Sequence, residues 1–274
     1  MSTEEYLKSA PLGHETAYVC HYDPAQLFPI PRGNHWQQQG FDSAPFQGCD
    51  IWNAYELSWL NLNGLPQVAT AEFRFPCDSI NIVESKSFKL YLNSFNLSRF
   101  ESVVQVRQHL IEDLSLAAGA AVTVTISSIE AETTIGRLTG ICLDHQKVEI
   151  EHYQPEPRLL SVINDEEVVD EQLYSHLLKS NCPVTGQPDW ASVQISYQGA
   201  PIDRQGLLKY LVSYREHGDF HEHCVEQIFL DILKYCQPLQ LTVYARYVRR
   251  GGLDINPFRS TESQPPENLR LVRQ

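Results

Sequence analysis

The chain has 274 residues, a length that allows one large domain or two domains of ordinary size. Hydrophobic residues make up 42% of it and charged residues 20%, and no long apolar stretch occurs, which together exclude a disordered chain and a membrane span. The balance of 21 Lys and Arg against 34 Asp and Glu gives a net charge of −13, which repels nucleic acid backbones. We therefore expect a soluble protein that binds neither nucleic acid directly nor a membrane.

The first residues carry Glu4, Glu5 and Lys8 and lack the apolar core of a secretory signal, which predicts a cytoplasmic protein. The seven cysteines are odd in number, widely spaced and without a C-x-x-C pair. This pattern argues against a disulfide framework and against a ribbon-type zinc site. We expect most of these cysteines to be buried, inert thiols.

Alternating apolar residues predict strands, in chain order, at residues 69–75, 122–126, 193–197 and 239–245. Apolar residues at helical spacing predict a helix over 103–114 and another over 225–233, each with one apolar face on a sheet. Residues 84–89 mix charges with hydroxyls, which favours a solvated loop ahead of a strand-like run over 89–95. The predicted class is therefore α+β.

An internal repeat organises these elements. The segment Lys89-Leu-Tyr-Leu-Asn-Ser-Phe95 aligns with Leu208-Lys-Tyr-Leu-Val-Ser-Tyr214 at an offset of 208 − 89 = 119 residues. Phe100 aligns with Phe220 at 220 − 100 = 120 residues, after one extra loop residue. The proline- and charge-rich segment 152–158 is the predicted linker, followed by an acidic exposed stretch over 165–171. We place one repeat at 1–158 and the other at 159–274, and we expect the tail after Pro257 to wrap the surface or fray.

Two polar residues of one predicted loop are candidates for chemistry. Cys182 lies between Asn181 and Pro183, where an exposed thiol could act as a nucleophile, and an inert thiol is the alternative. Asp189 lies in the same loop as a possible acid or base, although a turn or capping role is equally consistent with its position. The spacing alone decides neither.

The densest group of imidazoles and thiols is a possible zinc site formed by His217, His221, His223 and Cys224. Asp219 is predicted to be a helix N-cap with Glu222 as its capping-box partner, which puts His221 and His223 on different faces of one helix. We therefore predict no metal site here.

A basic group surrounds two glycines near the end of the chain, at Arg246, Arg249, Arg250, Gly251, Gly252 and Arg259. Arginine next to glycine allows backbone amides and a guanidinium to approach a phosphate together, which favours a phosphorylated ligand. Neither G-x-G-x-x-G nor G-x-x-x-x-G-K occurs, so no Rossmann or P-loop site is predicted.

These segments make the chain resemble the long, two-repeat form of the QueF family over essentially its whole length. The resemblance rests on Glu84-Ser-Lys-Ser-Phe-Lys89, Asn181-Cys-Pro-Val-Thr-Gly-Gln-Pro-Asp189, Phe220-His-Glu222, Arg249-Arg-Gly-Gly-Leu-Asp-Ile-Asn256 and Tyr55-Glu-Leu-Ser-Trp-Leu-Asn61. It implies an NADPH-dependent nitrile reductase that converts 7-cyano-7-deazaguanine to 7-aminomethyl-7-deazaguanine on the queuosine pathway of tRNA modification. The implied fold is tandem tunnelling-fold (T-fold) repeats, antiparallel sheets with helices packed on one face, assembled as a homodimer.

The resemblance also implies roles for individual residues. Cys182 would form a thioimide with the nitrile, and Asp189 would supply the proton to its nitrogen. The deazaguanine would be bound by Val83, Glu84, Ser85, His221 and Glu222, and NADPH by Ser85, Lys86, Arg250 and Gly251, with no metal.

Two other readings stay open. One is a zinc-dependent cyclohydrolase of similar architecture that acts on a purine or pterin, with Cys182 and the histidines as ligands. The other is a non-catalytic purine-binding or scaffold protein. Metal analysis separates the first from the reductase, and nitrile-dependent oxidation of NADPH separates the reductase from both.

Overall fold

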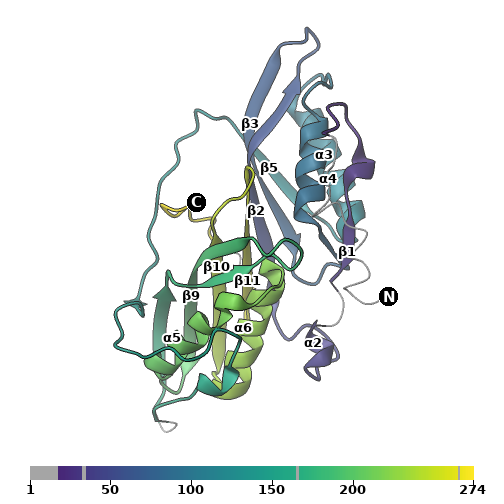
Figure 1. Ribbon diagram of the computed structural model, residues 1–274. Helices are drawn as coiled ribbons and strands as arrows, with labels where there is room; N and C mark the ends of the chain where they lie inside the picture. The colour runs from purple at the N-terminus through teal and green to yellow at the C-terminus, as the bar shows by residue number, and fades with distance from the viewer. Residues whose placement is uncertain (1–17, 33–34, 165–166, 265) are drawn as a thin grey trace. The chain divides into compact units, whose positions relative to one another are not determined.

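A computed structural model describes residues 18–32, 35–164, 167–264 and 266–274 (Figure 1). Two compact units divide the chain, and each draws on separate stretches of sequence. Unit 1 contains Asp50–Thr133 and Arg249–Asp254 with the described residues up to His35, and unit 2 contains Trp36–Cys49, Thr134–Val248 and Ile255–Gln274. The repeat boundary at residue 158 stays a prediction, because these units reflect contacts in space rather than repeats in sequence.

Unit 1 is built on three strands in the order β5 (Thr123–Ser127), β3 (Pro66–Pro76) and β2 (Gln47–Leu60). Helices α3 (Ser85–Ser94) and α4 (Val103–Ala118) lie on one face of these strands (Figure 1). Next to η1 (Pro24–Gln26), β1 (Pro29–Pro31) pairs antiparallel with β4 (Asn81–Val83). The core is aromatic, with the ring of Phe88 on α3 lying 5.0 Å from Phe73 and 5.3 Å from Trp52.

Unit 2 is built on strands in the order β11 (Leu253–Ser260), β10 (Gln240–Tyr247), β9 (Pro188–Gly199), β7 (Val169–Ser175) and β6 (Ile141–Cys142). Neighbouring strands are antiparallel except β6 and β7, and β8 (Lys179–Asn181) pairs with the start of β9. Helices α5 (Arg204–Ser213) and α6 (His221–Cys236) lie on one face of the strands (Figure 1). The shorter elements are α2 (His35–Gln38), η2 (Pro157–Leu159) and η3 (Tyr214–Glu216).

The α+β class, the four predicted strands and the two predicted helices are confirmed, as β3, β5, β9, β10, α4 and α6. The strand-like run over 89–95 and the solvated loop before it are wrong, because residues 85–94 form α3. Glu84 caps this helix by accepting bonds from the backbone N–H groups of Lys86 and Ser87. Asp203, the aligned residue of the second repeat, caps α5 in the same way. The repeat therefore extends to a pair of carboxylate caps.

The chain after Pro257 is more ordered than predicted. Leu253–Ser260 is strand β11, and Gln274 is buried with its side chain bonded to the Tyr247 carbonyl, to Asn256 and to Arg246. Fraying is thus the wrong expectation for these residues. The predicted acidic stretch lies partly outside the described residues, and its second half begins β7. Within the described part of the chain, no helix is long and apolar enough to cross a membrane.

Candidate functional site

Cys182 is the first residue of the loop that joins β8 to β9 in a hairpin. The register places Ser180 opposite Asp189 and Asn181 opposite Pro188. Because alternate residues of a strand share a face, Ser180 and Asp189 face the same side, and Cys182 follows Ser180 by two positions. The Cys182 N–H donates to the Gln187 carbonyl at 2.8 Å, which closes the loop. The hairpin thus holds the thiol and the carboxylate on one side.

The sequence predicts an exposed thiol in a loop, but Cys182 is buried. Cys182 is 4% accessible and Asp189 is 3% accessible. A long-range contact lies beside this loop: the Asn181 N–H donates to the His217 carbonyl at 2.8 Å, and the Asp219 N–H donates to the Asn181 carbonyl at 3.1 Å. The segment before α6 therefore pairs with the end of β8. The Thr185 N–H donates to the Cys182 sulfur at 3.5 Å, so the thiol is held by a bond within its own loop.

An imidazole meets the carboxylate. His221, the first residue of α6, has its Nε2 3.2 Å from Oδ2 of Asp189. Its ring stacks on that of Tyr247, with centroids 3.8 Å apart and planes 4° from parallel. Glu222 follows in the first turn of α6 and is buried. Unit 2 thus brings together a thiol, an acid and an imidazole from three separate elements.

The predicted capping box at the start of α6 is wrong. The N-cap residue is Phe220, and Glu222 lies inside the first turn. Asp219 instead accepts from the Phe220 N–H at 2.7 Å and lies 3.0 Å from Nδ1 of His223, with Nε2 of His217 at 3.7 Å from its other oxygen. Burial alone would raise the pKa of Asp219, but these hydrogen bonds hold it well below its usual range. Burial alone would lower the pKa of His223, but Asp219 raises it.

His221 and His223 face different partners, as their spacing predicts. Burial raises the pKa of the Cys224 thiol well above its usual range, so this thiol stays protonated. In the part of the chain that the structure describes, no group of three or more His, Cys, Asp or Glu residues is placed to hold a metal ion.

The second set of predicted residues lies in unit 1, at the start of α3. Val83 ends β4, Glu84 is the N-cap, and Ser85 and Lys86 begin the helix. The buried Glu84 carboxylate accepts from the Lys86 N–H and the Ser87 N–H, each at 2.7 Å, and burial raises the pKa of Glu84 despite these bonds. The anion-binding end of the helix is therefore occupied by the protein's own carboxylate.

Arg250 and Gly251 belong to the tip of the β10–β11 hairpin. The Arg250 N–H donates to the Leu253 carbonyl at 2.8 Å and the Leu253 N–H returns a bond at 3.2 Å, across a turn in which Gly251 and Gly252 have φ of 58° and 81°. Two consecutive left-handed residues define a tight hairpin turn that favours glycine.

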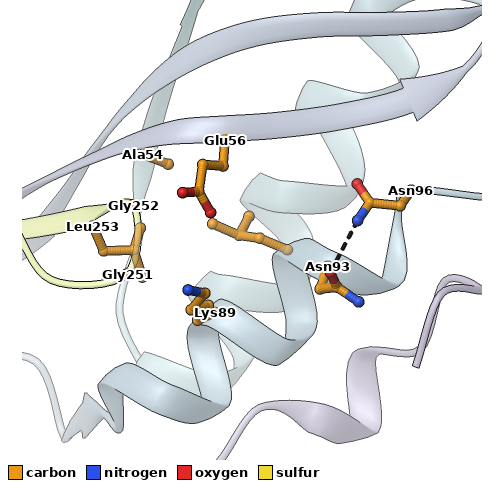
Figure 2. A pocket seen from close by; sticks show the side chains of 9 residues that line it. Ala54, Glu56, Lys89, Asn93, Asn96, Gly251, Gly252 and Leu253 are labelled. Atoms are coloured by element: carbon orange, nitrogen blue, oxygen red, sulfur yellow. Dashed lines mark hydrogen bonds between the residues drawn. The ribbon is translucent and has the colours of Figure 1, made fainter. Parts of the chain in front are cut away.

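This turn borders a cavity of about 100 Å³ in unit 1, shown in Figure 2. The ammonium of Lys89 and the carboxylate of Glu56 face the turn, and a Cβ added at Gly251 would lie 2.6 Å from Nζ of Lys89. Neither Lys89 nor Glu56 is assigned a role by the sequence. Lys89 follows Lys86 by one helical turn, a relation that becomes visible only once residues 85–94 are recognised as a helix.

An α+β protein in which a buried carboxylate contacts an imidazole and shares a hairpin with a buried thiol has the features of an enzyme rather than of a scaffold. Residues 18–126 match the family described as "Nitrile reductase, 7-cyano-7-deazaguanine-reductase N-term", and residues 188–266 match the family described as "QueF-like protein". The chain belongs to the QueF family of nitrile reductases.

Curated relatives extend over the whole chain. The NADPH-dependent 7-cyano-7-deazaguanine reductase of Bordetella pertussis is 57% identical over 98% of this chain and 99% of that protein. The enzyme of the same name from Burkholderia multivorans is 57% identical over 97% of this chain and 98% of that protein. A crystal structure of the archaeosine synthase QueF-Like in the apo form matches 36% of this chain and 96% of that chain, at 19% identity and a TM-score of 0.31.

Proposed function

We propose that this protein reduces the nitrile of 7-cyano-7-deazaguanine to the aminomethyl group with NADPH, in the biosynthesis of queuosine. It is an oxidoreductase of the QueF family, and its relatives carry this activity in their names. The observation that carries the proposal is the cluster in unit 2, where Asp189 shares a hairpin with Cys182 and contacts His221 at 3.2 Å. We also propose that the protein is a homodimer and acts in the cytoplasm.

The proposed covalent step adds the Cys182 thiol across the nitrile. The sulfur forms a bond to the nitrile carbon while one C–N π bond breaks, and Asp189 accepts the thiol proton and passes it to the nitrogen. The product is a thioimide, with every atom of thiol and nitrile retained. His221, whose Nε2 lies 3.2 Å from Oδ2 of Asp189, would orient this carboxylate toward the reacting group. Because Cys182 is buried, only a molecule that enters the site reaches the sulfur.

NADPH supplies hydride to the carbon, and two molecules are needed because nitrile to primary amine is a four-electron reduction. Of the four proposed cofactor residues, Gly251 lines the cavity of about 100 Å³ in unit 1. This volume is below the 300 Å³ or so of a small-molecule site, so the cavity has room for one group of the cofactor rather than for the dinucleotide. We assign a cofactor phosphate to Lys86 and Arg250, with Gly251 allowing close approach and Ser85 offering its hydroxyl.

We assign the substrate's guanine-like edge to Glu222, because an ionised carboxylate accepts two parallel N–H donors from the ring and the exocyclic amine. His221, Val83, Glu84 and Ser85 complete the proposed substrate contacts. Each oxygen of Glu84 already accepts one backbone N–H and keeps one lone pair, so the residue can hold α3 in place and also accept a donor from the substrate.

Intact mass spectrometry in the absence of NADPH tests this proposal. The protein incubated with the nitrile should gain the substrate's mass, Cys182→Ala should gain none, and Cys236→Ala, which also removes a buried thiol, should gain it fully. Asp189→Asn should slow adduct formation far more than it weakens binding. An adduct that survives in Cys182→Ala would overturn the assignment of the nucleophile.

A further inference from the structure

The contact between Tyr247 and His221 differs in geometry from the other ring contacts of α6. The rings of Tyr247 and His221 are stacked at 3.8 Å and 4°, whereas those of Phe220 and His223 meet edge-on at 5.6 Å and 82°. Tyr247 ends β10 and is fully buried. A parallel contact at this distance covers one whole face of the imidazole.

We propose that Tyr247 is a positioning residue that fixes the plane of the His221 imidazole for the reaction at Cys182. This inference rests on the proposed function in assigning that reaction to the Cys182 cluster. The contact itself is independent of any assigned activity.

Hydrogen bonding alone does not fix the His221 ring. Its Nε2 lies 3.2 Å from Oδ2 of Asp189, an ion-pair contact if the imidazole is protonated, and its buried Nδ1 has no hydrogen-bond partner among the described residues. A contact at one ring atom sets the position of that atom but leaves the ring free to tilt about it. The stacked phenol ring removes this tilt, so Asp189 and Tyr247 together define both the position and the plane of the imidazole.

Tyr247 is itself held at both ends of its backbone. Its N–H donates to Oδ1 of Asn256 at 3.1 Å, and its carbonyl accepts from Nε2 of Gln274 at 3.1 Å. Gln274 also donates to Asn256 at 2.8 Å, which closes a small network around the residue. On its other side Tyr247 pairs with Ala191 of β9, the strand that carries Asp189. The ring that stacks on His221 and the carboxylate that binds it are therefore held on neighbouring strands.

The aromatic ring rather than the hydroxyl performs this role. Burial, together with the neighbouring Cys224, Asp189 and Glu222, raises the pKa of the Tyr247 phenol well above its usual range, although Ser180 opposes the shift. The phenol therefore stays protonated at any pH at which the protein works and exchanges no proton with the site. Phenylalanine at position 247 should therefore keep the stacking contact with His221, whereas an aliphatic residue should lose it.

The test compares Tyr247→Phe, Tyr247→Leu and the control Tyr244→Leu. Tyr244 lies on the same strand, but its ring packs on Phe258 instead of His221. Adduct formation without NADPH gives a rate and an apparent dissociation constant for the nitrile. Tyr247→Leu should lower the rate by about tenfold, the scale of one aromatic contact, and change the dissociation constant much less. Tyr247→Phe and Tyr244→Leu should keep both values close to those of the unsubstituted protein.

A second readout needs no adduct. In ligand-free protein with labelled histidine, the ring protons of His221, assigned with His221→Gln, should be shifted upfield by the stacked ring. Tyr247→Phe should keep this shift and Tyr247→Leu should lose it. Unshifted His221 protons in the unsubstituted protein, an unchanged adduct rate in Tyr247→Leu, or equal loss in the Phe and Leu variants would overturn the inference. If Tyr247→Leu does not fold, the shift of the His221 ring protons in the unsubstituted protein and in Tyr247→Phe still tests the inference. An upfield shift without any adduct in the unsubstituted protein would instead contradict the proposed function.

Discussion

Glutamine in place of Glu226 is expected to destabilise the protein strongly, because it removes a carboxylate charge that lies against a buried guanidinium. Glu226 on α6 and Arg259 on β11 are both fully buried, with Nη2 of Arg259 2.7 Å and Nε 3.2 Å from Oε1 of Glu226. Arginine cannot lose its proton in a protein, so the positive charge remains in the substituted protein. This pair helps to hold the helix whose first residue is His221.

The magnitude follows from the burial of both groups. Removing one member of a buried ion pair costs about 3–5 kcal/mol. Glutamine keeps an acceptor of similar shape, and Arg259 also donates to the Phe258 carbonyl at 3.0 Å and lies 5.3 Å from the Phe46 ring. We therefore expect the lower end, about 3 kcal/mol, which corresponds to a fall in Tm of roughly 6–12 °C for a protein of this size.

Thermal and urea unfolding measure this effect. The matched control is Glu156→Gln, which removes the charge facing an Arg158 side chain that is 80% exposed and should leave Tm unchanged. Replacing both buried charges, as in Glu226→Leu with Arg259→Met, should recover much of the loss because no unpaired charge is left. A fall in Tm below about 2 °C for Glu226→Gln, with an unchanged urea m-value, would refute the reasoning.

Two further predictions concern the cofactor and the pH dependence of stability. Lys86→Ala or Arg250→Ala should raise the NADPH concentration needed by roughly tenfold, because each charge-assisted bond is worth about 1.5–3 kcal/mol. Steady-state kinetics should show a smaller loss with NADH if the contact is the 2′-phosphate and an equal loss if it is the pyrophosphate, while no loss with either would contradict the assignment. Because the pKa of Asp219 is lowered, its contribution to the free energy of unfolding is present at neutral pH and is lost as pH falls below the usual aspartate range. Because the pKa of His223 is raised, its contribution is present at low pH and is lost as pH rises through that pKa. Asp219→Asn should flatten both limbs in urea unfolding, and unchanged limbs would count against this pairing.

Strands with regular alternation could be predicted from the sequence, and others could not. β3 and β10 show apolar alternation in the sequence, whereas β2 contains the consecutive buried residues Asp50, Ile51 and Trp52, which interrupt the period of two. The run over 89–95 resembles a strand because Leu90, Tyr91 and Leu92 of α3 are all buried. The helix is signalled by the Glu84 cap and by apolar residues at helical spacing, which are Phe88, Tyr91, Leu92 and Phe95.

The candidate site divides in the same way between local and long-range features. Cys182 and Asp189 are close in sequence, so their place in one hairpin can be predicted from the local sequence. The burial of Cys182, the contact of His221 with Asp189 and the stack on Tyr247 depend on β8, β9, β10 and α6 meeting in space. Local propensity carries no information about such contacts, so the loop position of Cys182 predicts an exposed thiol where the structure has a buried one.

The most direct test of the central claim is the stoichiometry of NADPH oxidation in the presence of limiting 7-cyano-7-deazaguanine. If the protein reduces the nitrile through a thioimide at Cys182, two NADPH are oxidised for each nitrile converted to the aminomethyl product, and Cys182→Ala oxidises none. No nitrile-dependent oxidation by the unsubstituted protein, or undiminished oxidation by Cys182→Ala, would contradict the account.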